Sequence, residues 1–203
     1  MMTDKQSRIL LYGGSFNPPG LHHKRIAEKL VTLYDKVIIC PCGNRSDKST
    51  LSLAPLINRC EMVSMTFAGL KKLTIDSFDL ERDTFTPTYQ LQIRWKTRYP
   101  EAEIWHMVGS DLIVGGGLGI SQIQQTWRRG LELWQNLNFL VLERINYPFS
   151  LADLPPKSKM LDLKITKCSS TKIRQRLNQG KKISNLVSPD VADYIKEHEL
   201  YIK

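Results

Sequence analysis

The hydrophobic residues of this chain fall into two alternating patterns. Short apolar runs predict buried strands, and apolar residues spaced three or four apart between them predict amphipathic helices. The predicted strands cover residues 9–12, 36–41, 72–77, 103–108, 138–143 and 160–165. The predicted helices cover residues 21–33, 55–69, 86–99, 122–135, 169–179 and 189–197. Because strands and helices alternate, we expect parallel strands joined by right-handed helical crossovers.

This order of elements predicts an α/β fold with a doubly wound parallel sheet, and we expect residues 1–203 to form one domain. After residue 146 the chain is a loop rich in Pro, Lys and Ser and then mostly helical, so residues 146–203 are expected to form a small helical C-terminal lobe. Ligands of doubly wound sheets bind outside the carboxyl ends of the strands. The first predicted strand ends at Tyr12, Gly13 and Gly14, so we expect a ligand site there.

Composition narrows the class of protein. No window approaches the roughly 18 uninterrupted apolar residues of a membrane span, and the first residues, MMTDKQSR, lack the apolar core of a secretion signal, so we expect a cytoplasmic protein. The net charge of +9 is compatible with an ordinary basic surface, with a nucleic-acid partner or with small phosphorylated ligands. Cys40, Cys42, Cys60 and Cys168 lack paired metal-site spacing and are expected to be reduced.

The turn after the first predicted strand reads GGSFNPPGLHH, residues 13–23. Gly13 and Gly14 carry no side chain, so their backbone N–H groups can approach an anion closely. The following helix starts near Leu21, and its N-terminus points back at the turn with about half a positive charge. This pattern is neither a Walker loop nor GxGxxG, and the glycine-rich run at 115–119 also misses that spacing. An ordinary strand-to-helix loop remains the alternative at this point.

A second motif, CSSTKIR at residues 168–174, follows a predicted strand and opens a predicted helix. Ser169 or Ser170 suits the N-cap of that helix. Thr171 and Arg174 are three residues apart in its first turn and therefore share a face. Hydroxyl groups, a helix N-terminus and a guanidinium group together form an anion site. Alone, the motif is also typical of a capped helix with a surface arginine, but together with the first motif it indicates a phosphate site.

The two motifs resemble the HxGH and ISSTxIR signatures of the nucleotidyltransferase superfamily, which has a Rossmann-like fold. Within it, the chain from residue 9 to residue 201 is similar to bacterial nicotinate (nicotinamide) mononucleotide adenylyltransferases. The further matches that carry this similarity are Lys48, Arg59, Met62, Phe85, Thr86, Gly109, Ser110, Asp111, Trp127, residues 139–142, Arg144 and the C-terminal sequences LVSP and HELY.

The resemblance implies that the 5′-phosphate of the mononucleotide attacks the α-phosphorus of ATP and releases pyrophosphate, a step of NAD biosynthesis. No protein nucleophile is needed, so catalysis is expected to consist of positioning and charge stabilisation. Mg²⁺ would be carried on the ATP phosphates, without a metal site of the protein's own. The implied partners are ATP and a pyridine mononucleotide, not nucleic acid or a membrane, and a homo-oligomer is compatible with the sequence.

The resemblance also implies roles for individual residues. The expected catalytic residues are His23, Arg174 and Lys48. The expected ATP-binding residues are Gly13, Gly14, Ser15, Phe16, Gly20, His23, Gly109, Asp111, Ser169, Ser170, Thr171 and Arg174. The expected residues for nicotinate mononucleotide are Asn17, Lys48, Thr86, Trp127 and Arg144. Trp127 would place its aromatic face against the pyridine ring, with Trp134 as the competing tryptophan.

The chain departs from the family pattern at two places. Where the family has His-x-Gly-His, this chain has Gly20, Leu21, His22 and His23, so the first histidine is missing and a histidine replaces the glycine. Loss of one imidazole donor can lower a rate about 10²–10³-fold, and His22 is the candidate substitute. The second departure is the run at 113–121, which is longer and richer in glycine than the family's link.

Two alternatives to adenylyl transfer onto a pyridine mononucleotide stay open. One is a non-catalytic nucleotide-binding homologue, which would bind ATP without releasing pyrophosphate. The other is a nucleotidyltransferase with another phosphorylated acceptor, such as phosphopantetheine or a phosphorylated alcohol. The C-terminal sequence LVSPDVADYIKEHELY favours the pyridine nucleotide branch. The sequence leaves the choice between nicotinate and nicotinamide mononucleotide open.

Overall fold

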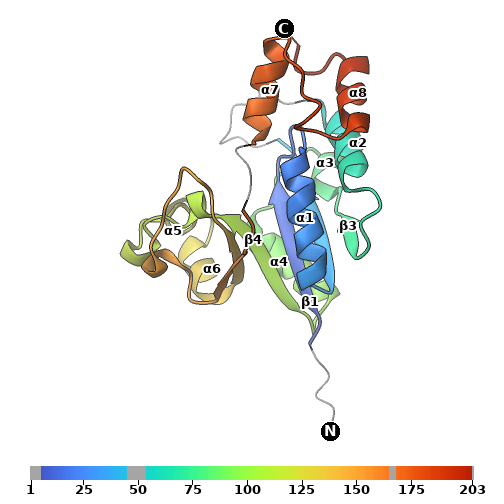
Figure 1. The fold of residues 1–203 in the computed structure, drawn as a ribbon. Coiled ribbons are helices and arrows are strands. Elements are labelled where there is room, and N and C mark those ends of the chain that lie inside the picture. The colour runs from blue at the N-terminus through green and yellow to red at the C-terminus, as the bar shows by residue number, and fades with distance from the viewer. Residues whose placement is uncertain (1–5, 45–53, 165–167, 203) are drawn as a thin grey trace. The chain divides into compact units, whose positions relative to one another are not determined.

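A parallel sheet forms the centre of the fold in the computed structural model, which describes residues 6–44, 54–164 and 168–202. Over these residues the sheet has six strands in the order β3-β2-β1-β4-β5-β6. Figure 1 labels β1, β3 and β4 among them. The strands are β1 (Arg8–Gly14), β2 (Lys36–Pro41), β3 (Leu73–Ile75), β4 (Glu103–Gly109), β5 (Asn138–Leu142) and β6 (Ser158–Met160). Strand pairs β1–β4, β4–β5 and β5–β6 are parallel. The strand order reverses between β1 and β4, which is the doubly wound topology, so the predicted fold class is confirmed.

Helices connect the strands, as the alternating pattern predicts. They are α1 (Leu21–Leu33), α2 (Leu56–Phe67), α3 (Phe78–Glu81), α4 (Thr88–Arg98), α5 (Gln122–Thr126), α6 (Gly130–Asn136), α7 (Ser170–Asn178) and α8 (Pro189–Glu197). Short 3₁₀ turns are η1 (Ser110–Leu112), η2 (Gly116–Leu118) and η3 (Leu151–Asp153). None of the helices within the described residues is long and apolar enough to cross a membrane.

The predicted single helix over 122–135 is wrong. The chain forms α5 and α6 instead, because α5 ends at an extended C-cap, Trp127 with ψ 138°, and Arg129 then takes a left-handed conformation with φ 63° where α6 begins. The apolar residues Ile123, Trp127, Leu131 and Trp134 keep helical spacing across the break, so periodicity could not reveal it. The last predicted strand, 160–165, is also displaced, since β6 covers Ser158–Met160 and residue 165 lies outside the described residues.

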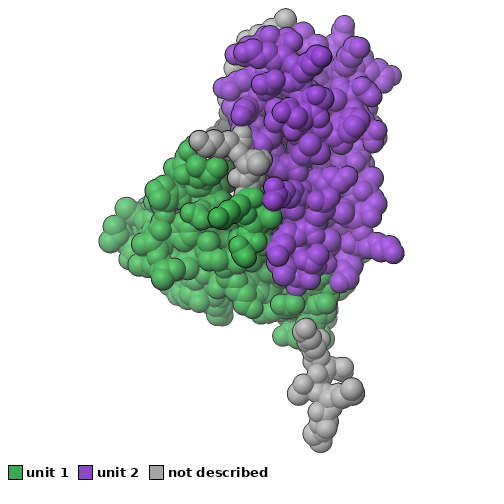
Figure 2. Space-filling model, in the orientation of Figure 1, with its two compact units in different colours: residues 1–12, 34–37, 86–164 green, residues 13–33, 38–85, 165–203 purple. Residues whose placement is uncertain are grey.

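The chain divides into two compact units that interleave along the sequence (Figure 2). The first unit consists of residues 1–12, 34–37 and 86–164, and the second of residues 13–33, 38–85 and 165–203. The first predicted motif and the second therefore both belong to the second unit. The organisation as one domain with a lobe over 146–203 stays a prediction; residues 146–164 cluster with the first unit.

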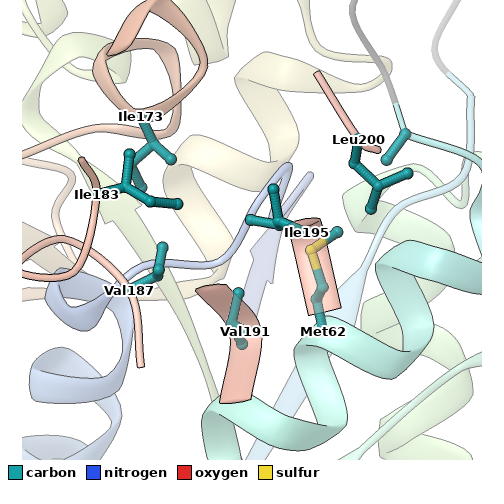
Figure 3. Close-up of a cluster of buried hydrophobic side chains, with 8 residues drawn as sticks. Met62, Ile173, Ile183, Val187, Val191, Ile195 and Leu200 are labelled. Carbon is teal, nitrogen blue, oxygen red and sulfur yellow. The ribbon is translucent and has the colours of Figure 1, made fainter. Parts of the chain in front are cut away.

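Each unit has its own hydrophobic core. In the second unit, side chains from α2, α7, α8 and the segment between α7 and α8 converge on one cluster (Figure 3). Its buried members are Ala54, Met62, Ile173, Ile183, Val187, Val191, Ile195 and Leu200. In the first unit, the core cluster is made of Val108, Ile113, Ile123, Leu133, Trp134, Leu137, Phe139 and Val141. Because Ile173 is fully buried, the second core holds α7 at the residue before Arg174.

Candidate active site

The turn after β1 is buried and tied down by its own asparagine. The Asn17 side chain is 1% exposed, and its Oδ1 accepts hydrogen bonds from the Ala54 backbone N–H at 3.0 Å and the Tyr201 hydroxyl at 2.6 Å. Burial is the main reason that the pKa of Tyr201 is raised, so this hydroxyl stays a donor at neutral pH. Asn17 therefore anchors the turn, and its expected contact with a mononucleotide stays a prediction.

Arg59 of α2 holds the same turn through hydrogen bonds to backbone carbonyls. It is fully buried, and its Nη1 donates to the carbonyl oxygens of Ser15 at 3.1 Å and Cys42 at 2.7 Å. The backbone N–H of Cys42 in turn donates to the Gly14 carbonyl at 3.0 Å. Burial lowers the pKa of Arg59. Arg59 is not among the site residues predicted from the sequence, although its spacing of three from Met62 indicates that it lies on the same, buried face of α2.

His23 lies at the start of α1 with its ring orientation set by the backbone. The Gly20 N–H donates to His23 Nδ1 at 3.0 Å. Because Nδ1 accepts this bond, the ring proton is on Nε2, which is then a donor. Phe16, 1% exposed, packs edge-on against the His23 ring with centroids 5.1 Å apart. The first turn of α1 has no acidic residue, so this helix end keeps its positive character.

The second motif contacts the turn directly. The Ser170 hydroxyl donates to the Pro18 carbonyl at 2.8 Å, and Arg174 Nη1 donates to the Asn17 carbonyl at 2.7 Å. Arg174 Nη2 also approaches the Thr171 hydroxyl at 3.4 Å, as expected for residues on one helix face. Burial lowers the pKa of Arg174. The structure thus brings the two signatures together, over a separation of about 150 residues.

The cap of α7 follows the sequence prediction. Ser169 is the N-cap, and its hydroxyl accepts a hydrogen bond from the Lys172 backbone N–H at 3.2 Å. Ser169 and Thr171 are exposed at this helix end, which leaves them accessible to a ligand. Hydroxyl groups, a helix N-terminus and the Arg174 guanidinium can together meet an anion. This arrangement suits the negatively charged oxygens of a polyphosphate.

The first unit holds the remaining described site residues. Asp111 and Arg144 pair with each other, with 3.0 Å between Asp111 Oδ1 and Arg144 Nε. A side chain at Gly109 would collide with both of these groups, which explains the glycine at the end of β4. Buried Ser110 fixes the pair's backbone, because its hydroxyl donates to the Tyr147 carbonyl and accepts from the Arg144 N–H, each at 2.9 Å.

The two tryptophans of this unit have different surroundings. Trp134 is 4% exposed and belongs to the core of the first unit. Trp127 only packs against the edge of that core and keeps part of its surface exposed. Trp127 is therefore the better candidate for stacking on a ring, and its contact with the pyridine ring stays a prediction. Thr86 is half-buried just before α4.

Lys48, an expected catalytic residue, lies outside the described residues. In the part of the chain that the structure describes, no three His, Cys, Asp or Glu side chains gather as a metal site would require. The expectation that Mg²⁺ is carried on ATP stays a prediction.

Comparison with known proteins identifies the family. The family model described as Cytidylyltransferase-like matches residues 11–176, which include both motifs. The chain belongs to the cytidylyltransferase-like family. It is accordingly a nucleotidyltransferase, and the superfamily resemblance noted in the sequence is confirmed.

The relatives of this cytidylyltransferase-like chain described next are all named as nicotinate-nucleotide or nicotinic acid mononucleotide adenylyltransferases. A protein of Methylacidiphilum infernorum, named probable nicotinate-nucleotide adenylyltransferase, is 29% identical over 96% of this chain and 92% of its own length. A protein of Exiguobacterium sibiricum with the same name is 29% identical over 96% and 98%. A solved structure of Plasmodium falciparum nicotinic acid mononucleotide adenylyltransferase complexed with NaAD has a TM-score of 0.79 at 25% identity, and covers 97% of this chain and 98% of that one.

Proposed function

We propose that this enzyme is a nicotinate-nucleotide adenylyltransferase, which transfers AMP from ATP to nicotinate or nicotinamide mononucleotide and releases pyrophosphate in NAD biosynthesis. The observation that carries the proposal is the joining of the two signature motifs by Ser170 and Arg174, which bond to the carbonyls of Pro18 and Asn17. Relatives that span nearly the whole chain are named for this activity, which supports the same acceptor.

The reaction needs positioned charge more than it needs a nucleophile from the protein. An oxygen of the mononucleotide 5′-phosphate forms a bond to the α-phosphorus of ATP. The bond from that phosphorus to the bridging oxygen breaks, and pyrophosphate leaves with the electron pair. Negative charge builds up on the phosphate oxygens during this exchange, so fixed donors lower the barrier. No general base is required, because the attacking phosphate is already ionised at neutral pH.

The second unit supplies the donors for ATP. His23 would donate from Nε2 to the α-phosphate, since its Nδ1 is occupied by the Gly20 N–H. Arg174, Ser170 and Thr171 would hold the β- and γ-phosphates at the N-terminus of α7. ATP would enter as its Mg²⁺ complex, in which the ion neutralises part of the triphosphate charge.

Of the residues assigned to the mononucleotide, Thr86, Trp127 and Arg144 belong to the first unit, and Asn17 belongs to the second. Trp127 would stack on the pyridine ring, and Thr86 and Arg144 would bind polar groups of the same ligand. Asp111 would bind the ribose of ATP, to which its carboxylate can accept hydrogen bonds. We infer a cytoplasmic location from these water-soluble substrates. We expect the positive net charge to attract phosphorylated small molecules rather than nucleic acid.

The experiment is pyrophosphate release from Mg·ATP with nicotinate mononucleotide, nicotinamide mononucleotide and phosphopantetheine in parallel. Release with a pyridine mononucleotide alone is the expected result, and the ratio of kcat/KM for the two pyridine forms gives the preference. Release only with phosphopantetheine would replace the acceptor. ATP binding without release with any of the three would instead indicate a non-catalytic nucleotide-binding protein.

A further inference from the structure

Gly20 has no room for a side chain. A Cβ atom added at this position would lie 2.8 Å from His22 Nδ1 and 2.9 Å from His22 Cε1. It would also lie 2.8 Å from the carbonyl oxygen of Leu186, which accepts a hydrogen bond from the Leu21 N–H at 2.8 Å. The space beside the Gly20 backbone is therefore filled by the imidazole of His22 and by a fixed backbone oxygen.

The His22 ring lies against the ring of His23. Their centroids are 3.8 Å apart and their planes are tilted by 39°. Consecutive residues of a regular helix point about 100° apart and do not face each other. The two rings meet because His22 turns back over Gly20 at the beginning of α1, where no side chain stands in its way. The chain thus presents two imidazole rings side by side at one helix N-terminus.

The position of the pair suits anion chemistry. His23 is oriented by the Gly20 N–H, and the first turn of α1 brings a positive helix end without an acidic residue. Both rings also lie beside the turn that Arg174 contacts through the Asn17 carbonyl. The N–H group of a second imidazole at this place can donate a hydrogen bond to phosphate oxygens as negative charge develops on them.

We propose that His22 is a catalytic residue that donates a hydrogen bond to phosphate oxygens of ATP in the transition state, and that Gly20 is required because the His22 ring occupies its side-chain space. The two positions act as one unit: the glycine at 20 makes room for the imidazole supplied from 22. This inference rests on the proposed adenylyl transfer, because it concerns the same bond exchange at the α-phosphorus.

The test compares His22→Ala and His22→Gln with wild type in pyrophosphate release from Mg·ATP and the pyridine mononucleotide. We expect kcat to fall about 100-fold in both variants, as for other lost transition-state donors, while KM for ATP changes less than about threefold. The matched control is His198→Ala, which removes an imidazole from the C-terminal end of α8, where it packs on Tyr194. The control should keep wild-type kcat, and thermal melting of each variant verifies folding.

A second variant tests the coupling with Gly20. Gly20→Ala would push the His22 ring away, so it should lower kcat strongly in wild type and clearly less in the His22→Ala background. The clash with the Leu186 carbonyl is present in both backgrounds and cancels from the comparison.

Wild-type kcat in a folded His22→Ala protein would overturn the role of His22 and leave the proposed function intact. Equal losses from Gly20→Ala in both backgrounds would overturn the link between the two positions. If wild type itself releases no pyrophosphate with either mononucleotide, the proposed function fails, and the role of His22 fails with it.

Discussion

The two units hold their site residues in different ways. In the second unit, Arg174, Ser170 and Tyr201 all form hydrogen bonds to Asn17 or Pro18, and these partners are buried. In the first unit, Asp111 and Arg144 mainly hold each other, and the Arg144 side chain remains 57% exposed. The turn after β1 in the second unit is therefore held in place by several hydrogen bonds. The exposed side chain of Arg144 in the first unit can instead rearrange around a ligand.

This difference matches the division of labour in the proposed reaction. Charge stabilisation at a triphosphate needs donors that do not move during the reaction, and in the proposed mechanism the second unit would supply them. Recognition of an acceptor can use groups that rearrange on binding, as an exposed ion pair does at little cost. Substitution of Arg174 should therefore act on kcat, substitution of Arg59 beneath the buried turn should act on stability, and substitution of the exposed Arg144 should act on KM for the mononucleotide.

The largest effect is expected from Arg174→Ala. We expect kcat to fall about 1000-fold, because the guanidinium group would meet charge on the departing pyrophosphate. The measurement is steady-state pyrophosphate release, with circular dichroism to verify the fold. The control is Arg176→Ala, which removes the same charge from the same helix, at a side chain whose Nε donates to the Lys182 carbonyl instead. Similar losses in both variants would contradict the assignment of Arg174.

The rigidity of the turn is tested by Arg59→Met. The substitution should lower the free energy of unfolding by about 3 kcal/mol, because the buried carbonyls of Ser15 and Cys42 lose their donor. Urea denaturation measures this loss. Arg82→Met is the control, since the Arg82 side chain is 56% exposed, and it should cost less than about 0.5 kcal/mol. A loss below about 1 kcal/mol for Arg59→Met would mean that the turn does not depend on this arginine.

The first unit should be sensitive to acid through His106. This histidine on β4 is buried, and burial lowers its pKa from 6.5 to about 4. Its Nε2 lies 2.8 Å from Gln92 Oε1. The unfolded chain therefore binds a proton on His106 more tightly than the folded protein does. The contribution of neutral His106 to the free energy of unfolding is complete above pH 6.5. It declines as the pH falls toward 4, by about 3 kcal/mol in total.

The measurement is urea denaturation of wild type and His106→Gln at pH 7 and pH 4.5. All other titrating groups are common to both proteins, so the difference between their losses isolates His106. Wild type should lose about 2 kcal/mol more than the variant over this interval. Equal losses would show that His106 can take up a proton in the folded state.

The smallest effect is expected from Arg144→Ala in the first unit. KM for nicotinate mononucleotide should rise about tenfold, while kcat and KM for ATP change less than about threefold. Arg128→Ala is the control, because Arg128 lies over the Tyr89 ring instead of pairing with Asp111. If KM for ATP rises as much as KM for the mononucleotide, Arg144 serves both substrates and its assignment to the mononucleotide alone is wrong.

Much of the architecture could be predicted from local pattern. The alternation of apolar runs and helical periodicity was enough to predict the doubly wound sheet, because both signals arise within a few residues. The cap at Ser169 and the shared face of Thr171 and Arg174 were predictable for the same reason. The break between α5 and α6 was not, because the extended Trp127 and the left-handed Arg129 leave the hydrophobic spacing unchanged.

The sequence by itself determined the fold class, the two signature motifs and the family to which they belong. Only the tertiary structure decided which side chains hold the site: Tyr201 reaches Asn17 across 184 residues, and Arg59 is buried under a turn 44 residues away. It also decided that the His22 ring fills the space beside Gly20. The physical reason is that local propensity acts over one or two helical turns, whereas a buried hydrogen bond or a filled space depends on how distant segments pack.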